Sequence, residues 1–301
     1  MPTPRSPASL APSSAFTVAE GRRAGLSTTT LRSAAWRAPH RGTRVAPEHD
    51  DRARLAALLR ACPDAAFFCG ATAALLHGLP LPLRIAESAR RMPVIGVPHD
   101  HVRIRRSGVI GRRLIVEVND VVEVDGIRCT SLLRTWAELA ETLPVPHLTA
   151  VSDFLIARRM TLATRGQLEQ THRRFLGGRG SKARRLAIDL ANEGSESPRE
   201  SELRVLLVMA GLPEPECNVE IYDGPRFVAR VDLLYRDKRT VLEYDGDHHR
   251  DPQQWSRDQR RRAELESLGY RYTSVTARDF DDPSALLARV RRFLARPANH
   301  A

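Results

Sequence analysis

Two apolar segments near the C-terminus, residues 230–235 and 240–249, limit most strongly what this chain can fold into. They read RVDLLY and TVLEYDGDHH, and four residues separate them, which is the spacing of a β-hairpin. If Asp237 and Lys238 form a two-residue turn, the residues on either side of them pair and the register of both strands is fixed. The sequence therefore predicts an antiparallel hairpin with defined cross-strand partners.

The predicted register gathers acidic side chains on one face of this hairpin. It places Asp232 opposite Glu243 and Arg230 opposite Asp245. Because side chains alternate between the two faces of a strand, the three carboxylates share one face. The other face, which we expect to lie against the core, carries apolar side chains: Val231, Leu233, Leu242 and Tyr244.

Two carboxylates that face each other across a ladder, with Cβ atoms roughly 5 Å apart, repel each other and destabilise the sheet. A divalent cation relieves that repulsion, since Mg²⁺ binds carboxylate oxygens while keeping several waters. Such a site hydrolyses phosphodiesters, because the metal activates water and stabilises the charged transition state. The alternative is a surface hairpin whose acids are solvated and balanced by Arg230 and Arg239.

The C-terminal third of the chain, residues 195–294, resembles the Vsr-like (very-short-patch-repair-like) branch of the PD-(D/E)xK restriction-endonuclease superfamily. The resemblance rests on motifs at these positions: residues 201–204, 230–233 and 242–246, His248, His249, Asp258, Arg261, Leu265, Gly269 and Tyr270. It implies a metal-dependent DNA endonuclease with a mixed β-sheet flanked by helices, and Mg²⁺ or Mn²⁺ as the cofactor. In that superfamily an Asp and a Glu on adjacent strands bind the metal, and by position these are Asp232 and Glu243.

The resemblance also implies roles for residues around the two metal ligands. Asp245 stands where the superfamily usually has a lysine, so a lysine-dependent mechanism is not expected, and Asp245 instead completes or adjusts the metal site. Glu202 matches the helical glutamate that supports the ligands, although the helix dipole also favours an acid in a first turn. His249, with His248 as the alternative, is the candidate general acid or base.

Two arginines are candidates for contact with the scissile phosphate. Arg230 begins the first strand of the hairpin, and Arg261 lies in a run of arginines at 260–262. A guanidinium binds phosphate through charge-assisted hydrogen bonds, often two in parallel. The alternatives are that this run forms a solvated helix face and that the two histidines lie in an exposed loop.

Helix signals on both sides of the hairpin complete an α/β domain with the order α-β-β-β-α-β-α. Ser197, Pro198 and Glu200 have the pattern of an N-cap, a first helical position and a capping box, and Gly211 ends that helix. The remaining elements follow from apolar spacing and breaker residues: a helix over 252–268, a strand over 270–275 and a helix over 282–294.

Charge is distributed unevenly along the chain, whose formal net charge is +11. Residues 195–301 hold 18 basic and 19 acidic side chains, whereas residues 1–194 hold 29 basic and 17 acidic ones. Because a protein binds nucleic acid largely by neutralising phosphates, the N-terminal two thirds are expected to supply most of the affinity for DNA. The alternative is a general enrichment in arginine that carries no functional meaning.

The N-terminal two thirds divide into segments with different signals. Residues 1–15 read as a disordered leader, and residues 16–47 as a helix-turn-helix with a basic β-wing or as an ordinary helical hairpin. Residues 48–175 are expected to form an α+β domain, because residues 70–80 and 126–140 resemble the antitoxins of abortive-infection, type IV toxin–antitoxin systems. That resemblance implies binding of DNA or of a toxin protein.

A Gly-rich linker with a short helix, residues 176–195, is expected to join this domain to the nuclease-like domain at 196–298. The sequence holds no run of 18 apolar residues, so a membrane span is not expected. The four cysteines lack the C-x-x-C spacing of a zinc site and indicate a reducing, cytoplasmic location.

These observations predict a multidomain α/β protein that acts as a metal-dependent DNA endonuclease, with a basic N-terminal region that binds DNA or a partner protein. The alternative hypothesis is a DNA-binding antitoxin or transcriptional regulator in which an inactive nuclease-like fold serves as a scaffold. The two hypotheses differ in whether Asp232 and Glu243 support phosphodiester cleavage.

Overall fold

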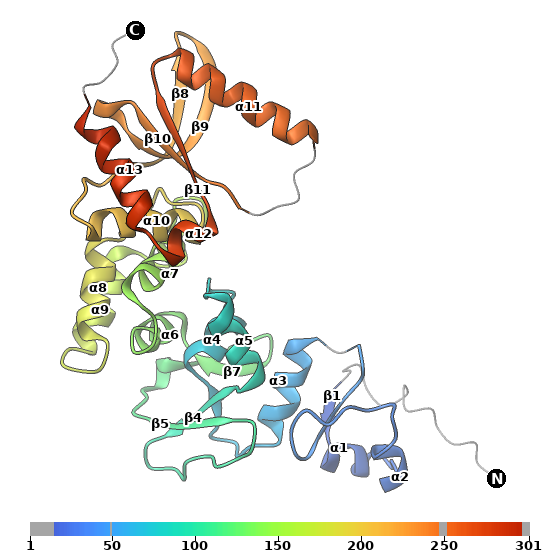
Figure 1. The fold of residues 1–301 in the computed structure, drawn as a ribbon. Helices are drawn as coiled ribbons and strands as arrows, with labels where there is room; N and C mark the ends of the chain where they lie inside the picture. Colours follow the sequence, from blue (N-terminus) through green and yellow to red (C-terminus); the bar gives the residue numbers. More distant parts are fainter. Residues whose placement is uncertain (1–14, 49, 247–251, 297–301) are drawn as a thin grey trace. The chain divides into compact units, whose positions relative to one another are not determined.

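The computed structural model describes residues 15–48, 50–246 and 252–296 (Figure 1). The chain divides into two compact units, Met1–Glu141 and Thr142–Ala301. This boundary lies earlier than the one that the sequence predicted at residue 175, because the helix that follows residue 144 packs on the helix that precedes the C-terminal sheet. Among the described residues, no helix is long and apolar enough to cross a membrane.

The N-terminal segment of the first unit consists of two short strands and three helices. In order they are β1 (Ala15–Thr17), α1 (Val18–Arg23), α2 (Thr28–Leu31), β2 (Thr43–Val45) and α3 (Asp51–Arg60). Thr17 caps α1 in a reciprocal pair with Glu20, and Gly25, at φ +87°, makes the turn before α2. β1 and β2 pair antiparallel, and α3 packs against both strands. The pairing shows that part of the expected basic wing is a strand, and the helix-turn-helix itself stays a prediction.

The rest of the first unit is a mixed sheet with the strand order β5-β4-β3-β7-β6. Its strands are β3 (Phe67–Phe68), β4 (Val94–Pro98), β5 (Ile110–Leu114), β6 (Val121–Val124) and β7 (Ile127–Thr130). Its helices are α4 (Gly70–Leu76), α5 (Leu83–Arg91), the 3₁₀ turn η2 (Val118–Asp120) and α6 (Leu132–Leu139). Asp125 and Gly126 turn between β6 and β7 with φ of 50° and 74°, as the predicted tight turn requires.

Polar side chains of this sheet domain have structural partners. The ring Nε2 of His77 lies 2.7 Å from the carbonyl oxygen of Thr130. The buried guanidinium of Arg134 donates to Glu138 at 2.8 Å and to Asp120 at 3.2 Å. Both residues therefore contribute to packing.

The second unit begins with helices and ends with a sheet of order β11-β10-β9-β8. Its helices are α7 (Val145–Ile156), α8 (Arg165–Arg174), α9 (Ser181–Asp189), α10 (Pro198–Met209), α11 (Pro252–Ser267), α12 (Ala277–Asp281) and α13 (Ser284–Ala295). Its strands are β8 (Glu216–Asp223), β9 (Arg226–Tyr235), β10 (Thr240–Tyr244) and β11 (Arg271–Val275). β8, β9 and β10 pair antiparallel and β11 pairs parallel to β10. The mixed α/β class and the order of elements from α10 onward are as predicted, with the short α12 added.

The register predicted for the β9–β10 hairpin is confirmed. Tyr235 pairs with Thr240, and Leu233 pairs with Leu242. The connection is the 3₁₀ turn η3 (Arg236–Lys238) followed by Arg239 at φ +42°, which extends the predicted two-residue turn without shifting the strands. Asp232 and Glu243 therefore occupy the positions that follow the Leu233–Leu242 pair on the two strands.

The hairpin is buried on both faces, which corrects the expectation that only one face meets the core. Leu233 and Leu242 pack with residues of α10 and α13, whereas Val231, which was predicted on the same face, packs in the other cluster with Leu265 of α11. Leu234 and Val241, which share the face of the acids, are also fully buried and pack with Leu265 of α11. Figure 1 shows α11 and α13 on opposite sides of the sheet. A strand covered on both faces is continuously apolar, as sheets with parallel pairing often are.

Candidate active site

Asp232 on β9 and Glu243 on β10 lie at the point where the ladder between the two strands ends. The Asp232 Oδ2 atom accepts a hydrogen bond of 2.8 Å from the backbone N–H of Tyr244, so a side chain replaces the next ladder bond. Burial raises the pKa of Asp232 to about 6, and the nearby charges of Glu200 and Glu243 add to the effect. The solvated surface hairpin that the sequence left open is therefore not what forms.

Glu243 is held from one side only. Its Oε2 atom accepts hydrogen bonds from Arg261 Nη2 at 2.7 Å and from the Tyr272 hydroxyl at 2.8 Å. Its Oε1 atom is buried and has no hydrogen-bond partner among the described residues. Burial raises the pKa of Glu243, while the charge of Arg261 lowers it. A buried carboxylate oxygen without a partner is costly, and a ligand at that position would remove the cost.

A pocket opens beside Glu243 at the end of β10. Asp245 lines it together with Asp258, Arg261 and Tyr272. The backbone N–H of Asp245 donates to the carbonyl oxygen of Val275 at 2.7 Å, which holds the end of β10 against β11. The pocket thus collects carboxylates and guanidinium groups in one place.

The helical acid near Asp232 is Glu200 and not Glu202, which the resemblance had indicated. Glu202 is buried in α10, where its oxygens pair with His147 Nδ1 at 2.9 Å and with Arg199 Nη1 at 2.7 Å. Glu200 is the residue of α10 whose charge raises the pKa of Asp232. Helical spacing could have identified it, because Glu200 precedes Leu203 by three residues, and Leu203 lies in the core beneath the sheet.

The predicted capping box at the start of α10 forms only in part. Ser197 accepts the N–H of Glu200 at 3.2 Å, as expected of an N-cap. The Glu200 carboxylate instead accepts the N–H of Glu196 at 3.0 Å and the side-chain amide of Asn218 at 2.6 Å. These bonds orient the Glu200 carboxylate toward β8 and β9.

The two arginines predicted to bind phosphate both have carboxylate partners. Arg230 pairs with Glu196 and lies 3.5 Å from the carbonyl oxygen of Asn218. Arg261 pairs with Glu243, with Asp258 at 3.6 Å. Arg261 lies in the pocket beside the acids, whereas Arg230 lies on the side of α10. His248 and His249 lie outside the described residues, so their roles stay predictions.

Within the described residues, no group of three or more His, Cys, Asp and Glu side chains converges in the arrangement of a metal site. The described part of the candidate active site offers Asp232 and Glu243 from facing strands, with Glu200 and Asp245 nearby. Oxygen atoms of this type are what hard divalent cations prefer.

Comparison with known proteins identifies relatives but no activity. No family model matches the chain, and no solved structure matches it. Two curated proteins of Mycobacterium tuberculosis match, "Uncharacterized protein MT2308" of strain CDC 1551 / Oshkosh and "Uncharacterized protein Rv2248" of strain H37Rv. Each is 30% identical over 263 residues, which is 85% of this chain and 91% of the relative. The match is long enough to include residues of both units.

Proposed function

The chain belongs to the same family as the mycobacterial proteins MT2308 and Rv2248, and we propose that it is a metal-dependent DNA endonuclease whose active site is in its C-terminal unit. One observation carries the proposal: the half-buried Asp232 and the buried Glu243 occupy the positions that follow the Leu233–Leu242 pair on the two facing strands. Two adjacent carboxylates that are wholly or partly buried are electrostatically unfavourable without a cation between them.

The donor atoms fit Mg²⁺ or Mn²⁺. Asp232 uses Oδ2 to accept the Tyr244 amide, and Glu243 uses Oε2 to accept Arg261 and Tyr272, so each carboxylate keeps one oxygen toward a cation. Asp245 lines the same pocket and would complete or adjust the site. The bound cation would activate water and neutralise charge on the phosphodiester in the transition state.

The protein's own groups would orient the reacting parts. Burial and the neighbouring carboxylate raise the pKa of Tyr272, so the phenol keeps its proton and fixes Glu243 by donating to it. Arg261 would turn from Glu243 to the scissile phosphate once a cation has taken over the carboxylate. Arg230 would contact the phosphate backbone from the α10 side, and His249 would move the proton to or from the reacting oxygen.

The basic first unit would supply DNA affinity. In the helix-turn-helix segment, Arg32, Arg37 and Arg41 are exposed around α2 and β2. A second candidate function follows from this segment, namely a DNA-binding antitoxin or transcriptional regulator that binds its own promoter without cutting. A toxin protein is a further partner that the antitoxin resemblance suggests, and the cytoplasm is the proposed location.

The test is cleavage of supercoiled plasmid and of single-stranded and mismatched oligonucleotides with Mg²⁺ or Mn²⁺. Asp232→Asn and Glu243→Gln should abolish cutting, whereas Glu216→Gln, an exposed acid of the same sheet that pairs with Arg236, should not. Circular dichroism checks that each variant is folded.

Metal binding gives an independent readout. Mg²⁺ should raise the thermal unfolding midpoint of the wild type but not that of Asp232→Asn, because binding to the folded state alone stabilises it. DNA binding without cutting under either metal would refute the endonuclease and support the regulator.

A further inference from the structure

A second pocket in the C-terminal unit lies beside the candidate active site and, apart from Arg230, holds no residue used in the chemistry proposed above. Its walls come from the end of α7 and the segment after it, the segment before α10, and strands β8 and β9. Its volume is about 280 Å³, at the lower end of small-molecule pockets. The pocket is therefore suited to one flat ring system and not to a larger ligand.

The lining of this pocket combines apolar surface with a polar edge. Phe154, Met160 and Leu162 supply apolar walls. The segment Glu193–Ser197 and Asn218 supply the polar edge. An aromatic or sulfur-containing wall opposite amide and hydroxyl groups matches a nucleobase, which stacks through its faces and forms hydrogen bonds through its rim.

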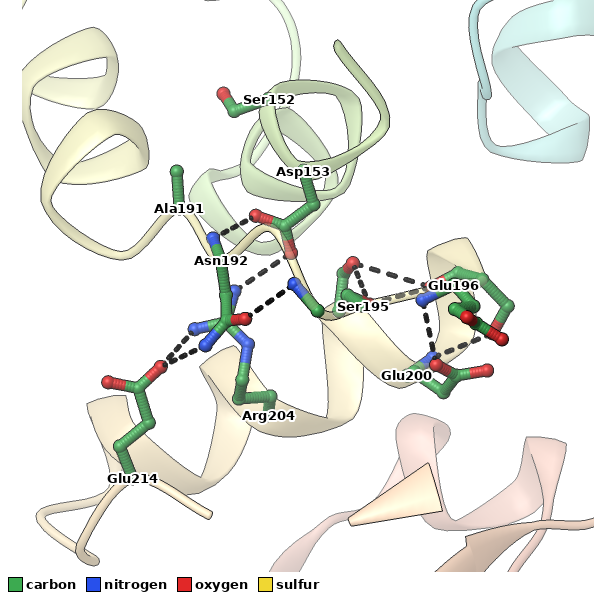
Figure 2. Close-up of polar contacts among 12 residues, drawn as sticks. Ser152, Asp153, Ala191, Asn192, Ser195, Glu196, Glu200, Arg204 and Glu214 are labelled. Carbon is green, nitrogen blue, oxygen red and sulfur yellow. Dashed lines mark hydrogen bonds and ion pairs between the residues drawn. The ribbon is translucent and has the colours of Figure 1, made fainter. Parts of the chain in front are cut away.

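The polar edge is held in place by partly buried hydrogen bonds (Figure 2). The N–H of Asn192 donates to Asp153 at 2.7 Å, and the N–H of Gly194 donates to the side-chain oxygen of Asn192 at 2.9 Å. The N–H of Glu196 donates to Glu200 at 3.0 Å. Because these bonds form within the protein itself, the pocket has its shape before a ligand arrives, and binding costs little ordering.

Direct contacts connect the pocket to the candidate active site. The side-chain amide of Asn218 donates to Gly194 in the pocket wall at 2.9 Å and to Glu200 at 2.6 Å, and Glu200 acts electrostatically on Asp232. Arg230 lines the pocket and precedes Asp232 by two residues on β9, which is roughly 7 Å along a strand. A nucleotide adjoining the scissile phosphate would therefore reach the pocket.

We propose that this pocket, formed where α7, the start of α10 and β9 meet, binds an unstacked nucleobase of the DNA strand that is cut. The inference rests on the proposed function, since it assigns the recognition of substrate to a position next to that site. The substrate class is DNA in which a nucleotide is unpaired or easily unstacked, because extruding a base costs least there.

The charged side chains around the pocket favour a neutral base inside it and negatively charged phosphates on either side. Arg158 and Arg159 are 78% and 74% exposed and lie 3.8 Å and 3.4 Å from Glu193 and Glu196. Such exposed pairs contribute little, so the arginines are available to the flanking phosphates. The two glutamates in the lining disfavour a phosphate inside the pocket and accept hydrogen bonds from a base.

The experiment measures binding of the full-length chain in EDTA, by fluorescence anisotropy, to two labelled duplexes. One contains a single bulged nucleotide, and the other has an abasic site at the same bulge. The wild type should bind the first duplex more tightly, by roughly fivefold to a hundredfold, which is the range for one stacked base. Phe154→Ala should remove that difference and leave the affinity for the abasic duplex unchanged.

Matched variants separate the pocket from general effects. Phe227→Ala removes an aromatic side chain that is 53% exposed and lies outside the pocket, and it should keep the preference. Met160→Ala changes a pocket residue that is 65% exposed, so this variant should fold even if Phe154→Ala does not. It should weaken the preference for the duplex with the bulged base.

Equal affinity of the wild type for both duplexes, or no binding to either, overturns the inference. A loss in Phe154→Ala or Met160→Ala that is the same for both duplexes also overturns it. The assay needs neither metal nor cleavage. If the protein prefers the duplex with the base but never cuts DNA, only the endonuclease proposal is refuted. If it cuts DNA without this preference, only the proposed role of the pocket is refuted.

Discussion

Replacing Asp232 by Asn should stabilise the metal-free protein at neutral pH. The carboxyl has a pKa of about 6 in the fold, against an ordinary value of 3.8, mainly because it is buried. The shift of about 2 pH units corresponds to about 3 kcal/mol in the free energy of unfolding. Asn keeps an oxygen that can accept the Tyr244 amide but carries no charge, so the variant removes this cost.

The sign of the pH dependence follows from the raised pKa. Well below the ordinary pKa of 3.8 the carboxyl is protonated in both folded and unfolded states, and its charge then makes no difference between wild type and variant. As the pH rises through 3.8 to about 6, the unfolded chain ionises first, and the wild type loses stability relative to Asp232→Asn. Above about pH 6.5 the difference should stay near its full value.

The assay is amide hydrogen exchange of the β9 and β10 segments between pH 4 and pH 8 in EDTA, followed by mass spectrometry and corrected for intrinsic exchange rates. Exchange reads the opening free energy of this sheet separately from the first unit. Asp237→Asn, in the exposed turn of the same hairpin, is the control and should show no such gain. A variant less stable than the wild type at pH 7, or a difference independent of pH, would refute the electrostatic argument.

Two further predictions concern neighbours of the site. Tyr272→Phe removes the hydroxyl that donates to Glu243 at 2.8 Å, so it should lower the free energy of unfolding by about 1 kcal/mol in chemical denaturation and slow any metal-dependent cleavage. Arg204→Leu leaves the Asp153 carboxylate buried without its partner at 2.8 Å, so it should destabilise the C-terminal unit by about 3 kcal/mol or more. In Arg204→Leu, unchanged exchange of the α7 and α10 amides would contradict that expectation.

The hairpin could be predicted because its register depends only on local spacing. Residues within about ten positions of the turn decide which side chains face each other, so Asp232 and Glu243 were found from sequence. The burial of Leu234 and Val241 could not be derived from the hairpin, because it depends on α11, which returns to the sheet after residue 252. A strand that is covered on both faces shows no clear alternation of apolar and polar residues, so its sequence does not reveal which face is buried.

The helical acid was misplaced for a different reason. The resemblance pointed to Glu202, whereas the α10 residue whose charge acts on Asp232 is Glu200, and the two lie about 200° apart around the helix. Their partners, His147 and Asn218, lie 55 residues before Glu202 and 18 residues after Glu200. Helix phase, measured from Leu203, would have been the better guide.

The ion pair between Asp153 and Arg204 has a consequence for how this protein was assembled. Arg204 is fully buried, and its partner lies on α7, upstream of the Gly-rich segment at 176–180 that looks like a natural seam between domains. Recombination within the Gly-rich segment would transfer the C-terminal sheet and Arg204 without Asp153, the carboxylate that pairs with Arg204. The heritable module therefore begins near residue 142, and homologues that exchange their N-terminal halves should share their crossover point there.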